Sequence, residues 1–284
     1  MTLLITGANG RLGSQIAQRI SDATLRLVDL PELDISDFDA VQRYFAVHRP
    51  STVIHCAAWT DVDGCATDPQ RAVRMNGLGT GNLAVACATV GAEMLYISTN
   101  EVFDGTRTDR PYWEYDTPNP INPYGYSKYV GEQELVRVLP RHYIVRTAWL
   151  FAHGGKNFVH SILRAVQSGK DLRVVTDEIA NPTYTNDLAE AVLQLLNTKR
   201  YGTYHLVNEG QASRWEFARY ILDQAGYSHT PITPITSEEW QRASRPPAHG
   251  GLMNVSANHL GITLRSWQSA VDAFLQADGN LSHD

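Results

Sequence analysis

A tyrosine and a lysine lie four residues apart in the stretch YGYSK, residues 124–128. On a helix, positions i and i+4 share one face, so Tyr124 and Lys128 can point into the same cleft. A phenol has a reference pKa of about 10, and a nearby ammonium group favours the phenolate and lowers that value. The pair therefore predicts a tyrosine that exchanges a proton with a substrate, provided that other reacting groups lie near it.

A hydroxyl partner is available in the stretch YISTNEVFDG, residues 96–105. Ser98 and Thr99 end an apolar run that reads as a strand over 93–99. Open α/β sheets bind their ligands outside the carboxyl ends of the strands. Either hydroxyl could therefore bond the same substrate oxygen as Tyr124.

The N-terminal stretch ITGANGRLG contains Gly7-x-x-Gly10-x-x-Gly13 between an expected strand and an expected helix. Such glycines permit a tight turn and close approach of the backbone to a pyrophosphate, which the helix N-terminus attracts. A purely structural glycine turn is the alternative. Asp29 ends the second strand, where an acidic side chain can bond the adenosine ribose of NAD. Arg11 could instead meet the 2′-phosphate of NADP, so the cofactor is predicted as NADPH or NADH.

These residues need a scaffold of alternating strands and helices. Apolar runs predict strands over 2–6, 25–30, 52–58, 93–99 and 142–150, and helical patterns fill 11–20, 36–49, 69–89 and 125–139. This alternation is typical of βαβ units, and it predicts an α/β fold with a doubly wound parallel sheet. We expect residues 1–150, with 182–207 returning to them, to form the dinucleotide-binding domain. Residues 151–181 and 208–284 would form a smaller substrate-binding region.

Composition excludes several classes of protein. The net charge of −6 over 284 residues argues against a nucleic-acid binder. Three cysteines without a C-x-x-C pair indicate buried thiols in a reducing compartment. No signal peptide and no apolar run of about 20 residues is evident, so a cytoplasmic protein without a membrane anchor is expected. The ten histidines show no metal-ligand spacing, and we predict no metal.

Several stretches together resemble a known family. The G-x-x-G-x-x-G spacing resembles the extended branch of the short-chain dehydrogenase/reductase superfamily. Within it, HCAAWTDVDGCATDP (55–69), STNEVFDG (98–105) and PNPINPYGYSKYVGEQ (118–133) resemble the dTDP-4-dehydrorhamnose reductases. The resemblance covers nearly the whole chain. The first two of these stretches are its more specific signals, since the glycine loop and Y-x-x-x-K occur throughout the superfamily.

The resemblance implies reduction of the 4-keto group of dTDP-4-dehydro-6-deoxy-L-mannose to dTDP-L-rhamnose. Tyr124 would give the proton to O4, Thr99 would polarise the carbonyl, and Lys128 would hold the nicotinamide ribose. It also implies two sets of binding residues. The cofactor would lie on Gly7, Asn9, Gly10, Arg11, Leu12, Gly13, Asp29, Ala57, Ala58, Trp59 and Asn76, and the substrate on Val62, Glu101, Phe103 and Trp149, with Asn157 and Arg245 at its diphosphate.

Two departures from the family pattern fall on the substrate side. The family's Asp-Tyr is replaced by Asn100 and Glu101, so a carboxyl group replaces a tyrosine beside the sugar. The segment RPPAHGGL (245–252) replaces R-P-x-N-S-x-L. A related 4-ketoreductase or epimerase acting on another deoxysugar is therefore an alternative, and so is a non-catalytic dinucleotide-binding subunit. No pattern predicts the oligomeric state.

Overall fold

The computed structural model describes residues 2–21, 24–154 and 157–279 of the chain. Its centre is a sheet of six parallel strands in the order β10-β5-β4-β3-β1-β2. The predicted doubly wound α/β fold is thereby confirmed. The strands are β1 (Leu3–Thr6), β2 (Leu25–Val28), β3 (Thr52–His55), β4 (Glu93–Thr99), β5 (His142–Thr147) and β10 (Gly202–His205).

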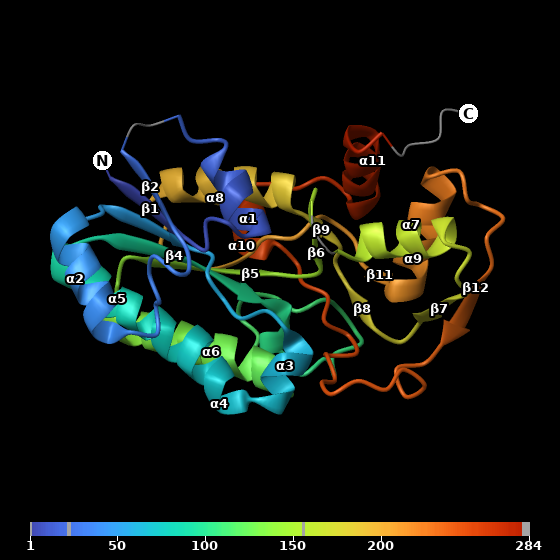
Figure 1. Cartoon of the computed structure of the whole chain (residues 1–284), viewed down its shortest axis with the longest axis horizontal. Helices are drawn as coiled ribbons and strands as arrows, with labels where there is room; N and C mark the ends of the chain where they lie inside the picture. The colour runs from blue at the N-terminus through green and yellow to red at the C-terminus, as the bar shows by residue number, and fades with distance from the viewer. Residues whose placement is uncertain (1, 22–23, 155–156, 280–284) are drawn as a thin grey trace.

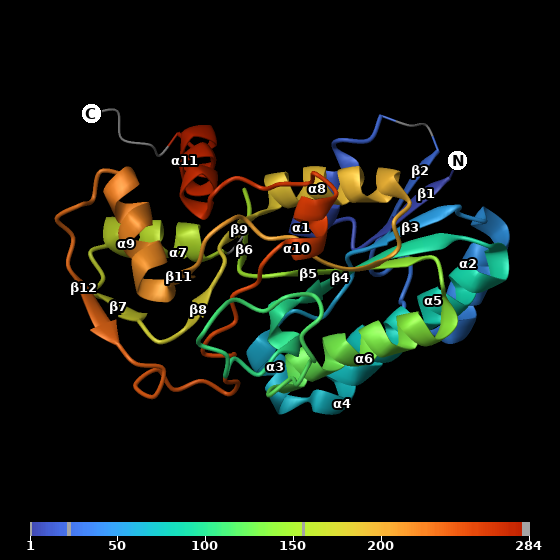
Figure 2. The same ribbon diagram turned by 180° about the vertical axis from the view of Figure 1, so that it is seen from behind.

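Helices cover both faces of this sheet, as Figures 1 and 2 show. One face packs against α1 (Arg11–Ala17), α8 (Thr185–Thr198) and α10 (Val255–His259), through a core that includes Ile16, Leu188 and Ala257. The other face packs against α2 (Phe38–His48), α5 (Gly79–Val90) and α6 (Pro123–Val138), through a core that includes Val41, Leu83 and Leu135. Both faces of the four inner strands are largely buried, which is why the central residues of each strand are apolar.

The long helix expected over residues 69–89 is divided in the structure. After α3 (Val62–Thr67), the chain forms α4 (Pro69–Ala72), a π-helical segment η1 (Val73–Leu78) and then α5. Single π-turns within α-helices are rare and are frequent at functional sites. This one carries Asn76, a residue to which the family resemblance also points.

The strand expected over residues 142–150 is interrupted. β5 ends at Thr147, and the next short strand is β6 (Leu150–Phe151). Between them Trp149 has φ of 41°, in the left-handed region that a bulky side chain rarely enters. This turn directs the chain out of the central sheet and towards the rest of the molecule.

The elements beyond the sheet pack around a core of their own, which includes Phe151, Phe217, Ile221 and Phe274. Three pairs of short strands tie this part together: β7 with β12, β8 with β11, and β6 with β9. Its elements are α7 (Phe158–Gln167), β7 (Leu172–Val175), β8 (Ile179–Ala180), β9 (Thr183–Tyr184), β11 (Ala212–Ser213), α9 (Arg214–Gln224), β12 (Ile232–Ile235) and α11 (Trp267–Ala277). Residues 155–156 and 280–284 of the expected substrate-binding region lie outside the described residues.

No helix in the described part of the chain is long and apolar enough to span a bilayer.

Candidate active site

The glycine loop joins β1 to α1, and it leaves no room for a side chain at Gly7 or at Gly13. Gly7 has φ of 70°, and a Cβ atom there would lie 2.5 Å from the backbone nitrogen of Ala57. A Cβ atom on Gly13 would lie 2.3 Å from the carbonyl oxygen of Gly7. The loop is therefore shaped so that backbone N–H groups at the start of α1 stay open to an anionic ligand. Its residues Gly7, Asn9, Gly10, Arg11, Leu12 and Gly13 line a cavity of about 850 Å³.

Asp29 follows β2 and lies beside this loop. Its carboxylate accepts hydrogen bonds from the backbone nitrogens of Asn9, at 2.9 Å, and Leu30, at 2.8 Å. It lines a second cavity of about 330 Å³ together with the three residues predicted to lie along the dinucleotide, Ala57, Ala58 and Trp59. Arg71 also lines this cavity, and its guanidinium group lies 4.4 Å from the Trp59 ring. No sequence pattern indicates Arg71, which brings a cation to the Asp29 end of the site.

Asn76 positions other residues rather than lining either cavity. Its Oδ1 accepts from the backbone nitrogen of Trp59 at 2.7 Å, and its Nδ2 donates to the Trp59 carbonyl at 3.0 Å and to the Ser127 hydroxyl at 2.9 Å. The side chain is fully buried. It therefore links the dinucleotide side of the site to α6, the helix that carries Tyr124 and Lys128.

Thr99, Tyr124 and Lys128 meet in the cavity of about 850 Å³. Thr99 is the last residue of β4, and its hydroxyl lies close enough to Tyr124 to lower the pKa of that phenol. The Lys128 ammonium lies 4.2 Å from the centre of the Tyr96 ring. Ser98, the other candidate hydroxyl, also lines the cavity but donates to Glu132 at 2.6 Å. The structure thus favours Thr99 over Ser98 as the partner of Tyr124.

Burial is the largest influence on the pKa values of Tyr124 and Lys128. It raises the pKa of Tyr124, and the Glu101 charge adds to the rise, while the Thr99 hydroxyl opposes it. The protein alone thus keeps Tyr124 protonated, whereas the sequence suggested a lowered pKa. Burial lowers the pKa of Lys128 to about 7, although the Glu132 charge raises it. Desolvation disfavours each charged form and outweighs the neighbouring charges.

The residues predicted for the substrate separate into two sets. Val62, Glu101 and Trp149 line the cavity with the three reacting side chains. Phe103 is fully buried beneath it, where its ring stacks on Tyr112 at 4.2 Å. Asn157 caps α7, with its Oδ1 accepting from the His160 nitrogen at 3.0 Å. Arg245 is exposed, and its carbonyl accepts from Asn122 at 3.1 Å. The structure does not place Phe103, Asn157 or Arg245 among the residues that line the cavity.

Arg214 is a charged cavity residue that the sequence analysis did not identify. Its guanidinium group lies 3.5 Å from the Trp149 ring, and its Nε lies 3.7 Å from Glu178. Burial lowers its pKa to about 10, so it stays charged at neutral pH. In the sequence it is the first residue of an ordinary amphipathic helix, and nothing there indicates that it faces the site.

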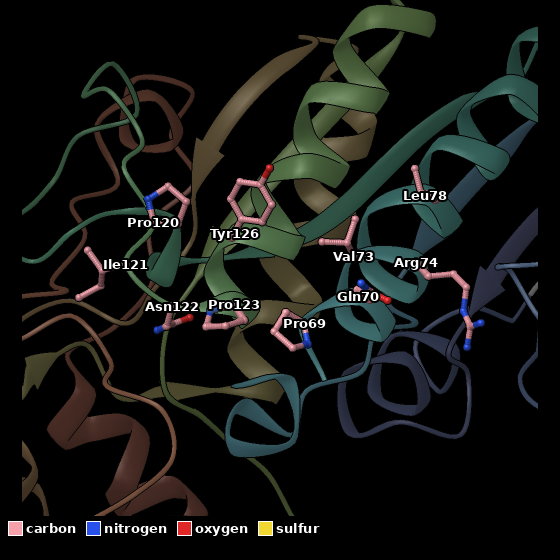
Figure 3. Close-up of a pocket in the computed structure, with 10 residues that line it drawn as sticks. All are labelled: Pro69, Gln70, Val73, Arg74, Leu78, Pro120, Ile121, Asn122, Pro123 and Tyr126. Carbon is pink, nitrogen blue, oxygen red and sulfur yellow. The ribbon is translucent and has the colours of Figure 1, made fainter. Parts of the chain in front are cut away.

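A third hollow lies between α4, η1 and the start of α6. Figure 3 shows side chains from α4 and η1, such as Leu78, on one side of it. On the other side are Ile121, from the loop before α6, and Tyr126, from the start of α6. Its volume is about 710 Å³ and its lining is mostly apolar. None of the three reacting side chains lines it, so it is separate from the candidate active site.

Residues 1–279 match the model of the family described as the RmlD substrate binding domain. The chain is 36% identical over 274 residues to a dTDP-4-dehydrorhamnose reductase of Mycolicibacterium smegmatis, covering 95% of this chain and 83% of that one. The chain belongs to the dTDP-4-dehydrorhamnose reductase family. Another relative, the spore coat polysaccharide biosynthesis protein SpsK of Bacillus subtilis, is 37% identical over 96% of each chain.

A solved family member shares the fold over nearly the whole chain. The crystal structure of the Bacillus anthracis dTDP-4-dehydrorhamnose reductase in complex with NADP superimposes with a TM-score of 0.93 at 36% identity, over 98% of this chain and 100% of that one. The extended-branch resemblance in the sequence is thereby confirmed at the level of the family. The roles of single residues remain predictions.

Proposed function

We propose that this protein reduces the 4-keto group of dTDP-4-dehydro-6-deoxy-L-mannose to dTDP-L-rhamnose, using NADPH or NADH. The observation that carries the proposal is the convergence of Thr99, Tyr124 and Lys128 on one cavity that continues to the glycine loop. Relatives named for this reaction cover almost the whole chain. In this proposal the elements around the central sheet, residues 1–150 and 182–207, hold the cofactor. Residues 151–181 and 208–284 supply the substrate wall.

The bound nicotinamide supplies the hydride to C4. Tyr124 donates the proton to O4, and its raised pKa suits this role because a donor must be protonated before the reaction. Thr99 hydrogen-bonds the same oxygen and polarises the carbonyl. Lys128 is placed one helical turn after Tyr124 to hold the nicotinamide ribose, and with a pKa of about 7 it can return a proton to the phenolate.

The cavity wall supports a contact for the substrate diphosphate that the sequence did not suggest. Arg214 presents a charged guanidinium group at the cavity, braced on the Trp149 ring. Planar guanidinium groups bind phosphate oxygens in pairs. Arg214 is therefore better placed for the diphosphate than Arg245 or Asn157, while Val62 and Trp149 would contact the sugar.

Free thiols support the proposed cytoplasmic location. Cys56, Cys65 and Cys87 form no disulfide, and burial raises the pKa of Cys56 to about 12 and that of Cys65 to about 11. Protonated, buried thiols of this kind persist in a reducing compartment.

The test is the consumption of NADPH and of NADH, followed by absorbance, with enzymatically generated dTDP-4-dehydro-6-deoxy-L-mannose. We expect sustained consumption of one of them, which also decides between the Asp29 and Arg11 interpretations of the cofactor. A protein that binds the cofactor but consumes neither form would exclude this reaction and favour another sugar nucleotide or a regulatory role. A cofactor that stays bound through purification would favour an epimerase.

A further inference from the structure

Glu101 brings to the active-site cavity a carboxyl group that the proposed reduction does not use. It lies in the short 3₁₀ segment η2 (Asn100–Val102), directly after β4. Its backbone N–H donates to the Thr99 hydroxyl at 3.2 Å. Its side chain lines the cavity with Thr99 and Tyr124. The carboxyl group is therefore on the same wall as the two hydroxyls that would bond the substrate carbonyl.

Two contacts hold Glu101 against the helix that carries Tyr124. Asn122 donates its Nδ2 to Glu101 Oε2 at 2.7 Å, while its Oδ1 accepts from the Gly125 nitrogen at 2.7 Å and caps α6. A Cβ atom on Gly125 would lie 1.9 Å from the Glu101 carbonyl oxygen, so the two backbones are in direct contact. The position of the carboxyl group relative to Tyr124 is thus fixed by the fold.

The charges around Glu101 leave it able to take up a proton. Burial raises its pKa, and the hydrogen bond from Asn122 and the charges of Arg242 and Arg214 oppose that rise. Glu178 raises it further. Among the described residues, no lysine, arginine or histidine forms an ion pair with Glu101. A carboxyl group engaged in a buried ion pair would be held as the anion, whereas this one can change its protonation state.

We propose that Glu101 gives this enzyme a second activity, the exchange with solvent of one hydrogen on a ring carbon next to the C4 carbonyl. The inference rests on the proposed function, because it requires a sugar with a ketone at C4 in this cavity. C–H bonds next to a ketone are acidic, and hydrogen bonds from Tyr124 and Thr99 to the ketone oxygen would make them more so.

The step balances without an oxidant or a reductant. The carbon–hydrogen bond breaks, its proton passes to the Glu101 carboxylate, and its electron pair forms a carbon–carbon double bond. The carbonyl π pair takes the Tyr124 proton at O4, which gives an enol. In reverse, Tyr124 regains its proton and Glu101 returns to carbon a proton that has exchanged with water. Because one fixed base acts from one wall, exchange is confined to a single carbon and retains its configuration.

The experiment uses dTDP-L-rhamnose, the enzyme and excess oxidised cofactor in D₂O, with no other enzyme present. Oxidation at C4 produces the ketone within the cavity, where the neighbouring carbon can take up deuterium. Reduction of the ketone back to the alcohol then keeps that deuterium in the sugar. The recovered sugar nucleotide is examined by proton NMR and mass spectrometry. We expect one deuterium at C3 or at C5 and no change of configuration. The C4 hydrogen is an internal control, because it moves to and from the cofactor and stays protium.

Three variants test whether Glu101 carries the exchange. Glu101→Gln removes the base, and we expect the ratio of exchange to C4 oxidation to fall by about 10²-fold or more. Glu101→Asp keeps a carboxyl group one methylene shorter and should restore part of that ratio. Glu134→Gln is the matched control. Glu134 lies on α6, the helix that carries Tyr124, and it pairs with Arg137 rather than lining the cavity, so the ratio should stay at the parent value.

Each result has one meaning. Reduced cofactor formed from dTDP-L-rhamnose without deuterium at C3 or C5 overturns the inference and leaves the proposed function standing. If the Glu101→Gln variant keeps the parent ratio of exchange to C4 oxidation, the inference is also overturned. Failure to form any reduced cofactor, with dTDP-L-rhamnose and either NADP⁺ or NAD⁺, contradicts the proposed function and removes the basis of the inference with it.

Discussion

Burial, more than neighbouring charge, sets the chemistry of the reacting residues. Tyr124 and Lys128 lie in the same desolvated cavity, and desolvation moves their proton affinities in opposite directions. The phenol of Tyr124 stays protonated, and the pKa of Lys128 falls to about 7, so this side chain can gain or lose a proton near neutral pH. This combination suits a reaction in which the phenol gives up a proton and must then regain one.

The lowered pKa of Lys128 predicts a dependence of stability on pH. Its pKa is about 7 in the folded chain, against 10.5 for the free side chain. Between these values the unfolded chain binds more protons, so the free energy of unfolding should rise with pH in this window. Lys128→Met removes the buried charge and keeps the apolar stem against Tyr96.

The comparison uses urea denaturation of Lys128→Met and of the parent at pH 6, 7.5 and 9. The variant should be stabilised relative to the parent most at pH 6, where Lys128 is charged in both states. That advantage should shrink as the pH rises towards 10. An advantage that is the same at all three values would show that Lys128 keeps an ordinary pKa.

At the scale of elements, three junctions set the geometry of the site. The turn from β1 into α1 forms the phosphate loop, the end of β4 presents Thr99, and the Asn122 cap starts α6 immediately before Tyr124. The π-helical segment η1 places Asn76 between the dinucleotide side and α6. Each junction is at a helix start or a strand end, where side chains can reach the cavity.

Close packing at the first junction gives a prediction. Gly13→Ala would place a Cβ atom 2.3 Å from the Gly7 carbonyl oxygen, which is backbone and cannot turn aside. The loop must move, so we expect about 1–3 kcal/mol of destabilisation and a clear loss of NADPH affinity. Fluorescence titration of the cofactor and chemical denaturation measure the two effects.

Gly91→Ala is the control for that variant. Gly91 ends α5 with φ of 74°, and a Cβ atom added there would meet none of the described atoms within 4 Å. The variant should lose stability through backbone strain, by about 1–2 kcal/mol, and keep its cofactor affinity. If both variants bound NADPH like the parent, tight packing of the glycine loop would not be what shapes the phosphate site.

At the scale of the whole molecule, the cavity lies between the carboxyl edge of the sheet and the part of the chain that follows Phe151. A segment that includes residues 242–252 returns from that part to the elements around the central sheet. Arg242 and Ser244 both bond Asp63 of α3, and the Gly250 carbonyl accepts from Asn100 at 3.0 Å. This segment includes residues 245–252, which depart from the family pattern, so that departure contacts Asn100, a residue that lines the cavity.

Residues in local motifs could be placed from the sequence, because their spacing fixes their geometry. The glycine loop, Thr99 and Lys128 lie where the sequence predicted them. Asp29 directly follows β2 rather than ending it, and Tyr124 lies in a helix that begins two residues earlier than predicted. Residues of the substrate wall could not be placed in this way. Arg214 reaches the cavity through a contact with Trp149, 65 residues earlier in the chain, and the φ of 41° at Trp149 has no sequence signature. Phe103 faces inward because Tyr112 and His205 complete its packing.

The central claim is that Tyr124 gives the proton to the sugar oxygen. Its most direct test is the rate of NADPH oxidation by Tyr124→Phe with dTDP-4-dehydro-6-deoxy-L-mannose, alongside a titration of NADPH binding. The variant should bind NADPH like the parent, because the phenyl ring keeps the packing, and its rate should fall by about 10²- to 10⁴-fold. A variant that reduces the substrate at the parent rate would contradict the role of Tyr124.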